Sequence, residues 1–126
     1  MPDRLTEAER QELLPALGEA GWGADPEQDA IRKIWKFRSF SEAWAFMSRV
    51  ALLAEKRNHH PDWRNVYNVV DLRLTTHAVG GLSKLDTDMA AVIDRYAGTA
   101  EVQQDQAQEI QCLCQLHHSR GASRQT

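Results

Sequence analysis

Three stretches of the chain repeat their apolar residues at helical spacing, and each begins with a capping-box pair. In a capping box, a Ser or Thr side chain and an acidic side chain three positions later satisfy free backbone N–H groups at the helix start. The pattern predicts helices over 5–17, 39–56 and 83–98. Their capping pairs are Thr6 with Glu9, Ser39 with Glu42, and Ser83 with Asp86.

Two further stretches, 29–38 and 66–77, alternate apolar and polar residues as strands do. Asn68 interrupts the apolar face of the second stretch, which predicts a bend or bulge there. Glycine and proline residues predict a short strand and turn over 22–28. The apolar faces consist of Ile31, Trp35 and Phe37 in the first long strand and of Val70, Leu72 and Leu74 in the second.

This order of elements predicts an α+β fold, in which an antiparallel sheet carries helices on one face. We expect the compact domain to span residues 1–98. Residues 99–126 hold seven glutamines and few large apolar side chains. They are therefore expected to be a frayed helix or a disordered tail.

Composition narrows the class of protein. The chain has 126 residues, 42% of them apolar, which is enough for one domain with a core. It has no apolar run of membrane-spanning length and no signal-peptide pattern. A net charge of −3 gives no basic footprint for nucleic acid. Cys112 and Cys114 offer no disulfide framework, so we expect a cytoplasmic protein.

Three histidines are the candidates for chemistry. His59 and His60 directly follow the predicted second helix, and Pro61 stiffens their loop. His77 stands at the end of the last predicted strand, and Asp86 begins the next helix. Imidazole has an unperturbed pKa of about 6.5, so it both gives and takes protons near neutral pH. These side chains are consistent with an acid–base site.

A zinc site is the alternative reading of the same three histidines. Adjacent histidines usually point in divergent directions, so spacing alone modestly favours metal-free chemistry without deciding the matter. A second cluster near the C-terminus matches no common zinc-finger spacing. It consists of Cys112, Cys114, His117 and His118.

Residues 55–63, with the sequence Glu-Lys-Arg-Asn-His-His-Pro-Asp-Trp, resemble the signature of the pterin-4a-carbinolamine dehydratases. That signature reads Glu-Lys, two variable residues, His-His-Pro, one variable residue and Trp, and every fixed position is present. The segments 65–68, 76–77 and 81–86 also resemble the family at the expected spacing. The resemblance extends over about residues 4–97.

The resemblance implies a four-stranded antiparallel sheet with three helices packed on one face. It also implies a hydro-lyase that removes the 4a-hydroxyl of a hydroxylated pterin as water, yielding a quinonoid dihydropterin. This reaction recycles the tetrahydrobiopterin-type cofactor of aromatic amino acid hydroxylases. Neither a metal nor an organic cofactor is implied. The family forms homodimers or homotetramers.

By motif position, the active-site histidines of the family correspond to His59, His60 and His77. We expect His59 and His77 to form the acid–base pair in an unassigned order, and His60 to orient the pterin. The supporting positions correspond to Glu55, Pro61, Trp63 and Asp86. Ala78 and Val79 fall where the family varies, and the tail after residue 98 exceeds the family pattern.

Two other functions remain open at this point. Some animal members of the family also serve as a dimerisation cofactor for a homeodomain transcription factor, which would make the chain a protein-binding module. Other members occur without a hydroxylase, which suggests a pterin enzyme linked to molybdenum-cofactor metabolism.

Overall fold

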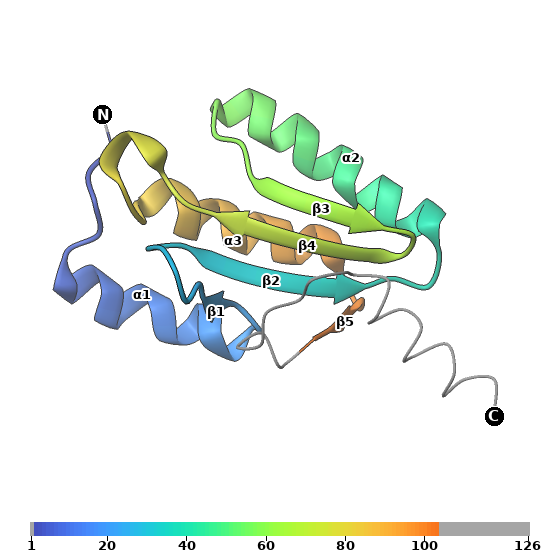
Figure 1. The fold of residues 1–126 in the computed structure, drawn as a ribbon, viewed down its shortest axis with the longest axis horizontal. Helices are drawn as coiled ribbons and strands as arrows, with labels where there is room; N and C mark the ends of the chain where they lie inside the picture. The colour runs from blue at the N-terminus through green and yellow to red at the C-terminus, as the bar shows by residue number, and fades with distance from the viewer. Residues whose placement is uncertain (1, 104–126) are drawn as a thin grey trace.

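The computed structural model describes residues 2–103 of the chain. They form an α+β fold in which helices and strands follow one another with short connections (Figure 1). The helices are α1 (Glu7–Glu19), α2 (Phe40–Arg57) and α3 (Lys84–Ala97), with a short 3₁₀ helix η1 (His77–Val79). The strands are β1 (Gly23–Ala24), β2 (Ile31–Lys36), β3 (Asp62–Val66), β4 (Val69–Leu74) and β5 (Glu101–Val102).

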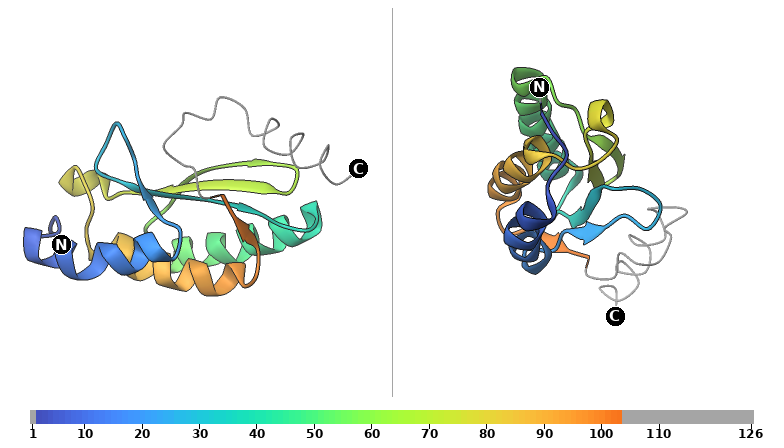
Figure 2. Two further views of the ribbon diagram at one scale, coloured as in Figure 1. Left: turned by 90° about the horizontal axis from the view of Figure 1, so that it is seen from below. Right: turned by 90° about the vertical axis from the view of Figure 1, so that its left-hand side faces the viewer.

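The strands form one antiparallel sheet in the order β1-β2-β4-β3, and β5 also pairs with β2. The three α-helices lie together on one face of this sheet (Figure 2). The predicted α+β architecture is therefore confirmed, with short β5 added to the four expected strands. No helix among the described residues has both the length and the apolar character needed to cross a membrane.

The main core lies between the sheet and the helices. Alternate residues of β2 and β4 point toward the helices and meet the apolar stripes of α2 and α3. In α1, by contrast, no residue is fully buried, and Leu13, Leu14 and Leu17 only pack against the core edge. The buried aromatic and large aliphatic residues of this core include Trp22, Trp35, Phe37, Phe46, Val50, Leu72, Leu74, Met89 and Ile93.

Lys33 breaks the apolar alternation of β2, and tertiary contacts explain how the sheet tolerates it. Its side chain is only 5% exposed, and Nζ donates a 2.6 Å hydrogen bond to Asp94 on α3. The ammonium group also lies over the rings of Trp22 and Trp35, at 5.8 and 5.3 Å from their centroids. The buried charge is thus paired and in contact with two aromatic faces.

The long strand predicted over 66–77 is wrong in its bounds. The chain instead makes a hairpin: β3 ends at Val66, Tyr67 turns with a φ of 52°, and β4 begins at Val69. Asn68, predicted to mark a bend, lies in this turn and donates its side-chain N–H to the carbonyl of Phe37. Strand β3 was missed because its polar residues show no apolar alternation.

The segment after Gly98 also differs from its prediction. We expected a frayed helix or a disordered tail from residue 99, but Glu101–Val102 pair with Lys36 and Trp35 of β2. Strand β1 pairs only with Ile31 and Arg32 on this edge of β2, which leaves the backbone groups of the later β2 residues for β5 to pair with. The remainder of the predicted tail lies outside the described residues.

Two of the three predicted capping boxes form in full. Thr6 with Glu9 and Ser83 with Asp86 exchange both hydrogen bonds. At the start of α2, Ser39 accepts from the backbone N–H of Glu42, but the Glu42 carboxylate binds Arg38 instead of closing the box. The helix starts predicted from sequence are confirmed to within one or two residues.

Candidate active site

The end of α2 determines where His59 points. Asn58 adopts a left-handed conformation with a φ of 50°, which stops the helix. The backbone N–H of His59 then donates to the carbonyl of Ala54 at 3.0 Å, as in a Schellman-type ending. This tight turn directs the His59 ring inward, so that the residue is only 9% exposed.

The buried His59 ring meets a buried carboxylate. His59 Nε2 lies 2.6 Å from Oδ1 of Asp86, and the Asp86 side chain is 0% exposed. An ionised carboxylate only accepts hydrogen bonds, so this contact requires a proton on Nε2. His59 Nδ1 forms no hydrogen bond within the described residues and is the ring nitrogen left for a ligand.

Within residues 2–103, three donors hold Asp86. Its Oδ2 accepts from Thr76 Oγ1 at 2.7 Å and from the backbone N–H of Ser83 at 3.0 Å. The two hydroxyls of Thr76 and Ser83 are also 2.7 Å apart. Because Asp86 lies in the first turn of α3, the positive end of the helix also favours its charge. Its helix-capping and histidine-binding roles therefore coexist.

His60 has the opposite environment. Its side chain is 57% exposed, and Nε2 lies 3.3 Å from Oε1 of Glu55, which is itself 84% exposed. The pair joins the last turns of α2 to the loop that follows. Two adjacent histidines thus divide between the interior and the surface, as their expected divergence requires.

His77 does not end a strand, contrary to prediction. It opens η1, after β4 has ended at Leu74, and its side chain is exposed. The loop that carries it is closed at its base by a bridge between Thr76 and Gly81. Since Thr76 binds Asp86, the residue before His77 is joined to the same carboxylate as His59.

Pro61 and Trp63 support this region from its edge. Pro61 directly precedes β3 and is half-buried. Trp63 pairs with Leu72 of β4 and packs against the main core. The predicted supporting positions of the His-His-Pro segment thus belong to the start of an edge strand.

Sequence reasoning missed the part that Thr76 plays in this network. It also treated Ser83 only as a helix cap, although the Ser83 hydroxyl contacts the Thr76 hydroxyl that binds Asp86. The available signal was position: Thr76 immediately precedes a candidate histidine, and Ser83 is the capping partner of a candidate acid. Neither feature specifies a contact across the 76–86 segment.

Other features of the described residues lie apart from these histidines. The His, Cys, Asp and Glu side chains of residues 2–103 form no group of three or more that could hold a metal ion. The Cys112 to His118 cluster lies outside the described part of the chain.

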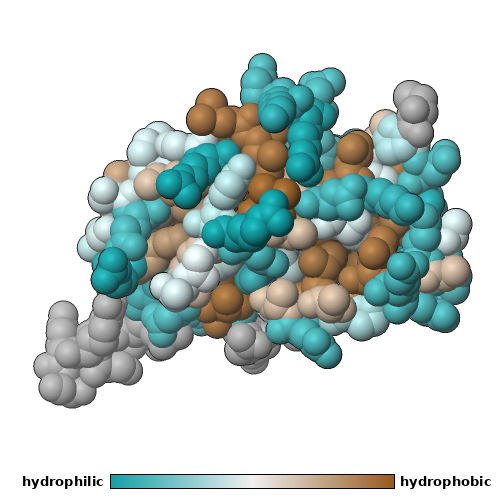
Figure 3. Space-filling model, turned by 180° about the vertical axis from the view of Figure 1, so that it is seen from behind, coloured by the Kyte–Doolittle hydropathy of each residue, from teal (hydrophilic) through white to brown (hydrophobic). Residues whose placement is uncertain are grey.

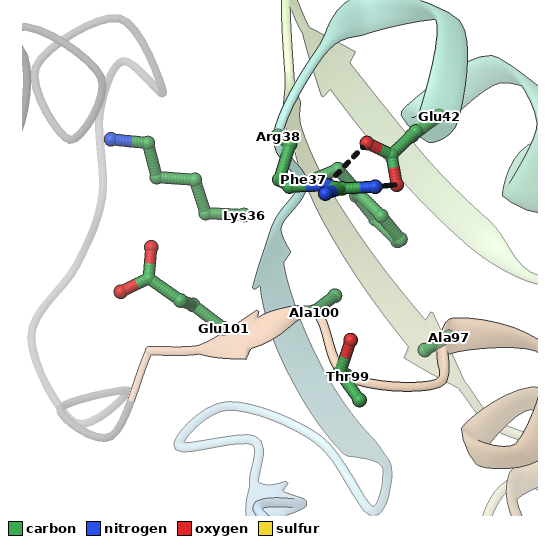
Figure 4. A pocket seen from close by; sticks show the side chains of 8 residues that line it. All are labelled: Lys36, Phe37, Arg38, Glu42, Ala97, Thr99, Ala100 and Glu101. Carbon is green, nitrogen blue, oxygen red and sulfur yellow. Dashed lines mark hydrogen bonds and ion pairs between the residues drawn. The ribbon is translucent and has the colours of Figure 1, made fainter.

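A separate hollow lies between the ends of β2 and α3 (Figure 4). It is lined by Lys36, Phe37, Arg38, Glu42, Ala97, Thr99, Ala100 and Glu101, none of them a predicted site residue.

Comparison with known proteins gives a consistent match. The family model described as pterin 4 alpha carbinolamine dehydratase matches residues 3–96. A protein of Rhodopseudomonas palustris (strain HaA2), named "Putative pterin-4-alpha-carbinolamine dehydratase", is 49% identical over 78% of this chain and 95% of its own length. A protein of the same name from Dinoroseobacter shibae is 48% identical over 77% of this chain and 100% of its own length.

Two solved structures share the fold. One, described as a transcriptional coactivator/pterin dehydratase from Brucella melitensis, has a TM-score of 0.71 and 46% identity. The match covers 76% of this chain and 100% of that one. The other is described as a pterin dehydratase-like RuBisCO assembly factor of the alpha-carboxysome, with a TM-score of 0.54 and 24% identity. It covers 62% of this chain and 90% of its own, and it shows the fold alone.

Proposed function

Because the chain belongs to the pterin 4 alpha carbinolamine dehydratase family, we propose that it is a hydro-lyase that dehydrates a 4a-hydroxytetrahydropterin. The observation that supports this proposal most directly is the buried contact of 2.6 Å between His59 and Asp86. An imidazole held in one orientation by a buried carboxylate is suited to positioned proton transfer.

The reaction needs two proton transfers. Hydroxide is a poor leaving group, so an acid must deliver a proton to the 4a oxygen as the C4a–O bond breaks. The lone pair of ring nitrogen N5 forms the new C4a–N5 double bond, and a base takes the N5 proton. The products are water and a quinonoid dihydropterin. Each positioned transfer contributes roughly 10²–10⁴ in rate.

The proposed roles follow the environments of the three histidines. His59 presents Nδ1 to the pterin, because Asp86 occupies its Nε2. His77 is the second member of the acid–base pair, since the Thr76 hydroxyl ties the start of its loop to the same carboxylate. His60, exposed beside Glu55, orients the pterin rather than moving its protons. No cofactor is required by this scheme.

A stopped-flow assay of 4a-hydroxytetrahydropterin dehydration tests the proposal. Wild type should accelerate the reaction, and His59→Ala should lower kcat by roughly 10²–10⁴. His60→Ala is the matched control from the adjacent position, and its main effect should be on KM. A wild-type protein that does not accelerate dehydration, or a fully active His59→Ala variant, would contradict the enzymatic role.

We further propose that the protein is a homodimer or homotetramer. The described α2 surface carries exposed Phe40 and Trp44, with ring centroids 6.0 Å apart, and exposed Leu52. Hydrophobic surface is visible among polar residues on the face of the molecule that bears α2 and α3 (Figure 3). Exposed apolar side chains grouped in this way are typical of interfaces. A monomer mass by light scattering at micromolar concentration would contradict this.

A protein-binding role is the second candidate, because the 46% identical Brucella relative is described as a transcriptional coactivator as well as a pterin dehydratase. The two roles separate in the His59→Ala variant, which should lose dehydration but keep any protein partner.

Within the enzymatic role, we place the protein in the cytoplasm and assign it to cofactor recycling. Genomic pairing with an aromatic amino acid hydroxylase would support recycling, whereas pairing with molybdenum-cofactor genes would redirect the physiological substrate.

A further inference from the structure

Asp29, just before β2, binds several groups from other parts of the fold. Its Oδ2 accepts a 3.0 Å hydrogen bond from the backbone N–H of Leu82, and its backbone carbonyl accepts from Thr75 Oγ1 at 2.8 Å. From α1, Arg10 binds both carboxylate oxygens, at 2.9 and 2.6 Å. Arg4 adds a longer contact of 3.4 Å. None of these contacts was expected from the sequence.

The contacts of Asp29 flank the loop that carries His77. Thr75 directly precedes that loop, and Leu82 directly follows it. Between them, Thr76 and Gly81 exchange backbone hydrogen bonds of 3.0 and 3.3 Å. The loop therefore projects from a base that Asp29 holds on both sides. The N-terminal segment lies beside the same base, where Leu5 donates to the Leu82 carbonyl (Figure 1).

Gly81 shows how closely the carboxylate approaches this base. A Cβ atom at position 81 would lie 2.2 Å from Oδ2 of Asp29, far inside van der Waals contact. The φ of Gly81 is not among the positive values of the chain, so the close approach, rather than backbone strain, is what calls for glycine here. The same glycine belongs to the segment that resembles the family.

The charge state of Asp29 suits a permanent structural bond. Its hydrogen bonds from Arg10, together with that from Leu82, lower the pKa of the carboxyl to about 2 against the effect of burial. The carboxylate is therefore ionised at every pH at which imidazole titrates.

We propose that Asp29 is a positioning residue for His77, holding the base of the residue 76–81 loop so that the imidazole is set for proton transfer. This inference rests on the proposed function in that it takes His77 to be part of the acid–base pair. Asp29 itself touches no reacting atom in this scheme. Its carboxylate acts through Leu82 and is itself held by Arg10 of α1, whereas the contact with Thr75 is made by the backbone carbonyl and remains in any variant at position 29.

The test compares wild type with Asp29→Ala and Asp29→Asn. In Asp29→Ala, the backbone amides of Thr76, Gly81 and Leu82 should exchange with solvent at least tenfold faster. Its kcat for dehydration should fall by roughly 10–100-fold with little change in KM, because misplacement by about 1 Å has effects of this size. Asp29→Asn keeps an oxygen acceptor for Leu82 and should recover part of the lost kcat.

Asp94→Ala is the matched control. The Asp94 side chain is 22% exposed against 23% for Asp29, and it accepts from one cation, Lys33, and from the ring N–H of Trp22, whereas Asp29 binds a second cation, Arg4. It lies away from the residue 76–81 loop. We expect it to lower Tm at least as much as Asp29→Ala, because it leaves the buried Lys33 ammonium without its carboxylate, while leaving kcat and loop-amide exchange unchanged when assayed below both melting temperatures.

A double-mutant cycle with Gly81→Ala adds a second readout. Gly81→Ala alone should speed loop-amide exchange and lower kcat, because the new methyl displaces the Asp29 carboxylate. In the Asp29→Ala background the same change should add less, since the oxygen 2.2 Å from the new Cβ is gone and the remaining close atom, Nε of Arg4 at 3.1 Å, belongs to a flexible side chain. Equal effects in both backgrounds, or wild-type amide exchange in Asp29→Ala, would overturn the proposal. If wild type itself fails to dehydrate the pterin, the proposed function fails, while amide exchange still decides whether Asp29 holds the loop.

Discussion

His59 and His60 are neighbours in the chain, yet the fold treats them in opposite ways. His59 is buried against Asp86 at 2.6 Å, and that carboxylate is bound in turn by Thr76 and Ser83. His60 lies at the surface with one contact of 3.3 Å to exposed Glu55. The difference shows that a motif supplies identical side chains, whereas the tertiary contacts decide which of them is held rigidly.

The contrast has an energetic basis. A buried polar group costs free energy unless its hydrogen bonds are made, so the donors around Asp86 hold the carboxylate and the His59 ring in place. An exposed pair such as His60 and Glu55 exchanges freely with water and contributes little to stability. The buried environment of His59 is suited to precise proton transfer, and the exposed environment of His60 is suited to adaptable contact with a ligand.

The largest effect is expected from Asp86→Asn, which removes the buried carboxylate that binds His59. The amide group supplies one acceptor oxygen where the carboxylate has two. Its NH₂ would therefore face either the backbone N–H of Ser83 or the His59 ring. Binding to the ring would move the His59 proton to Nδ1. We expect kcat to fall by roughly 10² or more and stability to fall by about 1–3 kcal/mol. Stopped-flow kinetics and urea unfolding measure the two effects.

The control for this variant is Asp88→Asn, because Asp88 lies on the exposed side of the same helix. It removes one charge from α3 without touching the His59 network. Equal loss of activity in both variants would mean that the charge of α3, rather than the His59 contact, is what matters.

An intermediate effect is expected on acidification, which tests the carboxylate of Asp29 beside the loop that carries His77. Because the pKa of Asp29 is lowered to about 2, its bonds stabilise the fold fully above the unfolded-state value. That contribution is lost as pH falls from about 5 toward 2. The shift corresponds to at most about 2–3 kcal/mol, and solvent screening reduces it to about 1 kcal/mol.

Urea unfolding as a function of pH measures this contribution. The Asp29→Asn variant should be less stable than wild type at pH 7, and the two curves should converge near pH 2. A constant difference between them from pH 7 to pH 2 would show that Asp29 titrates normally in the folded protein.

The smallest effect is expected from Glu55→Gln, which removes the charged partner of His60. Tm should not change measurably, since the pair is exposed. The kcat of dehydration should stay within a few-fold of wild type, and any change should appear in KM. A loss of kcat as large as that of Asp86→Asn would remove the distinction drawn between the two histidines.

Local sequence determined a large part of this fold. The capping pairs Thr6–Glu9 and Ser83–Asp86 place the starts of α1 and α3, because each acts over a single helical turn. The stripe of α2 and the faces of β2 and β4 likewise follow from spacing alone. Strand β3 does not, because its residues are mostly polar and it exists through its pairing with β4.

For the candidate site, the sequence by itself determined the residue types and their likeness to a signature, which are local properties of residues 55–63 and 76–86. Only the tertiary structure decided that Asp86 binds His59 rather than merely capping α3, and that Asp29 reaches the base of the His77 loop. The first contact joins two residues that are 27 positions apart along the chain, and the second joins two that are 53 positions apart. Short-range rules of spacing and capping carry no information about them, because such pairs form only when the sheet and helices pack together.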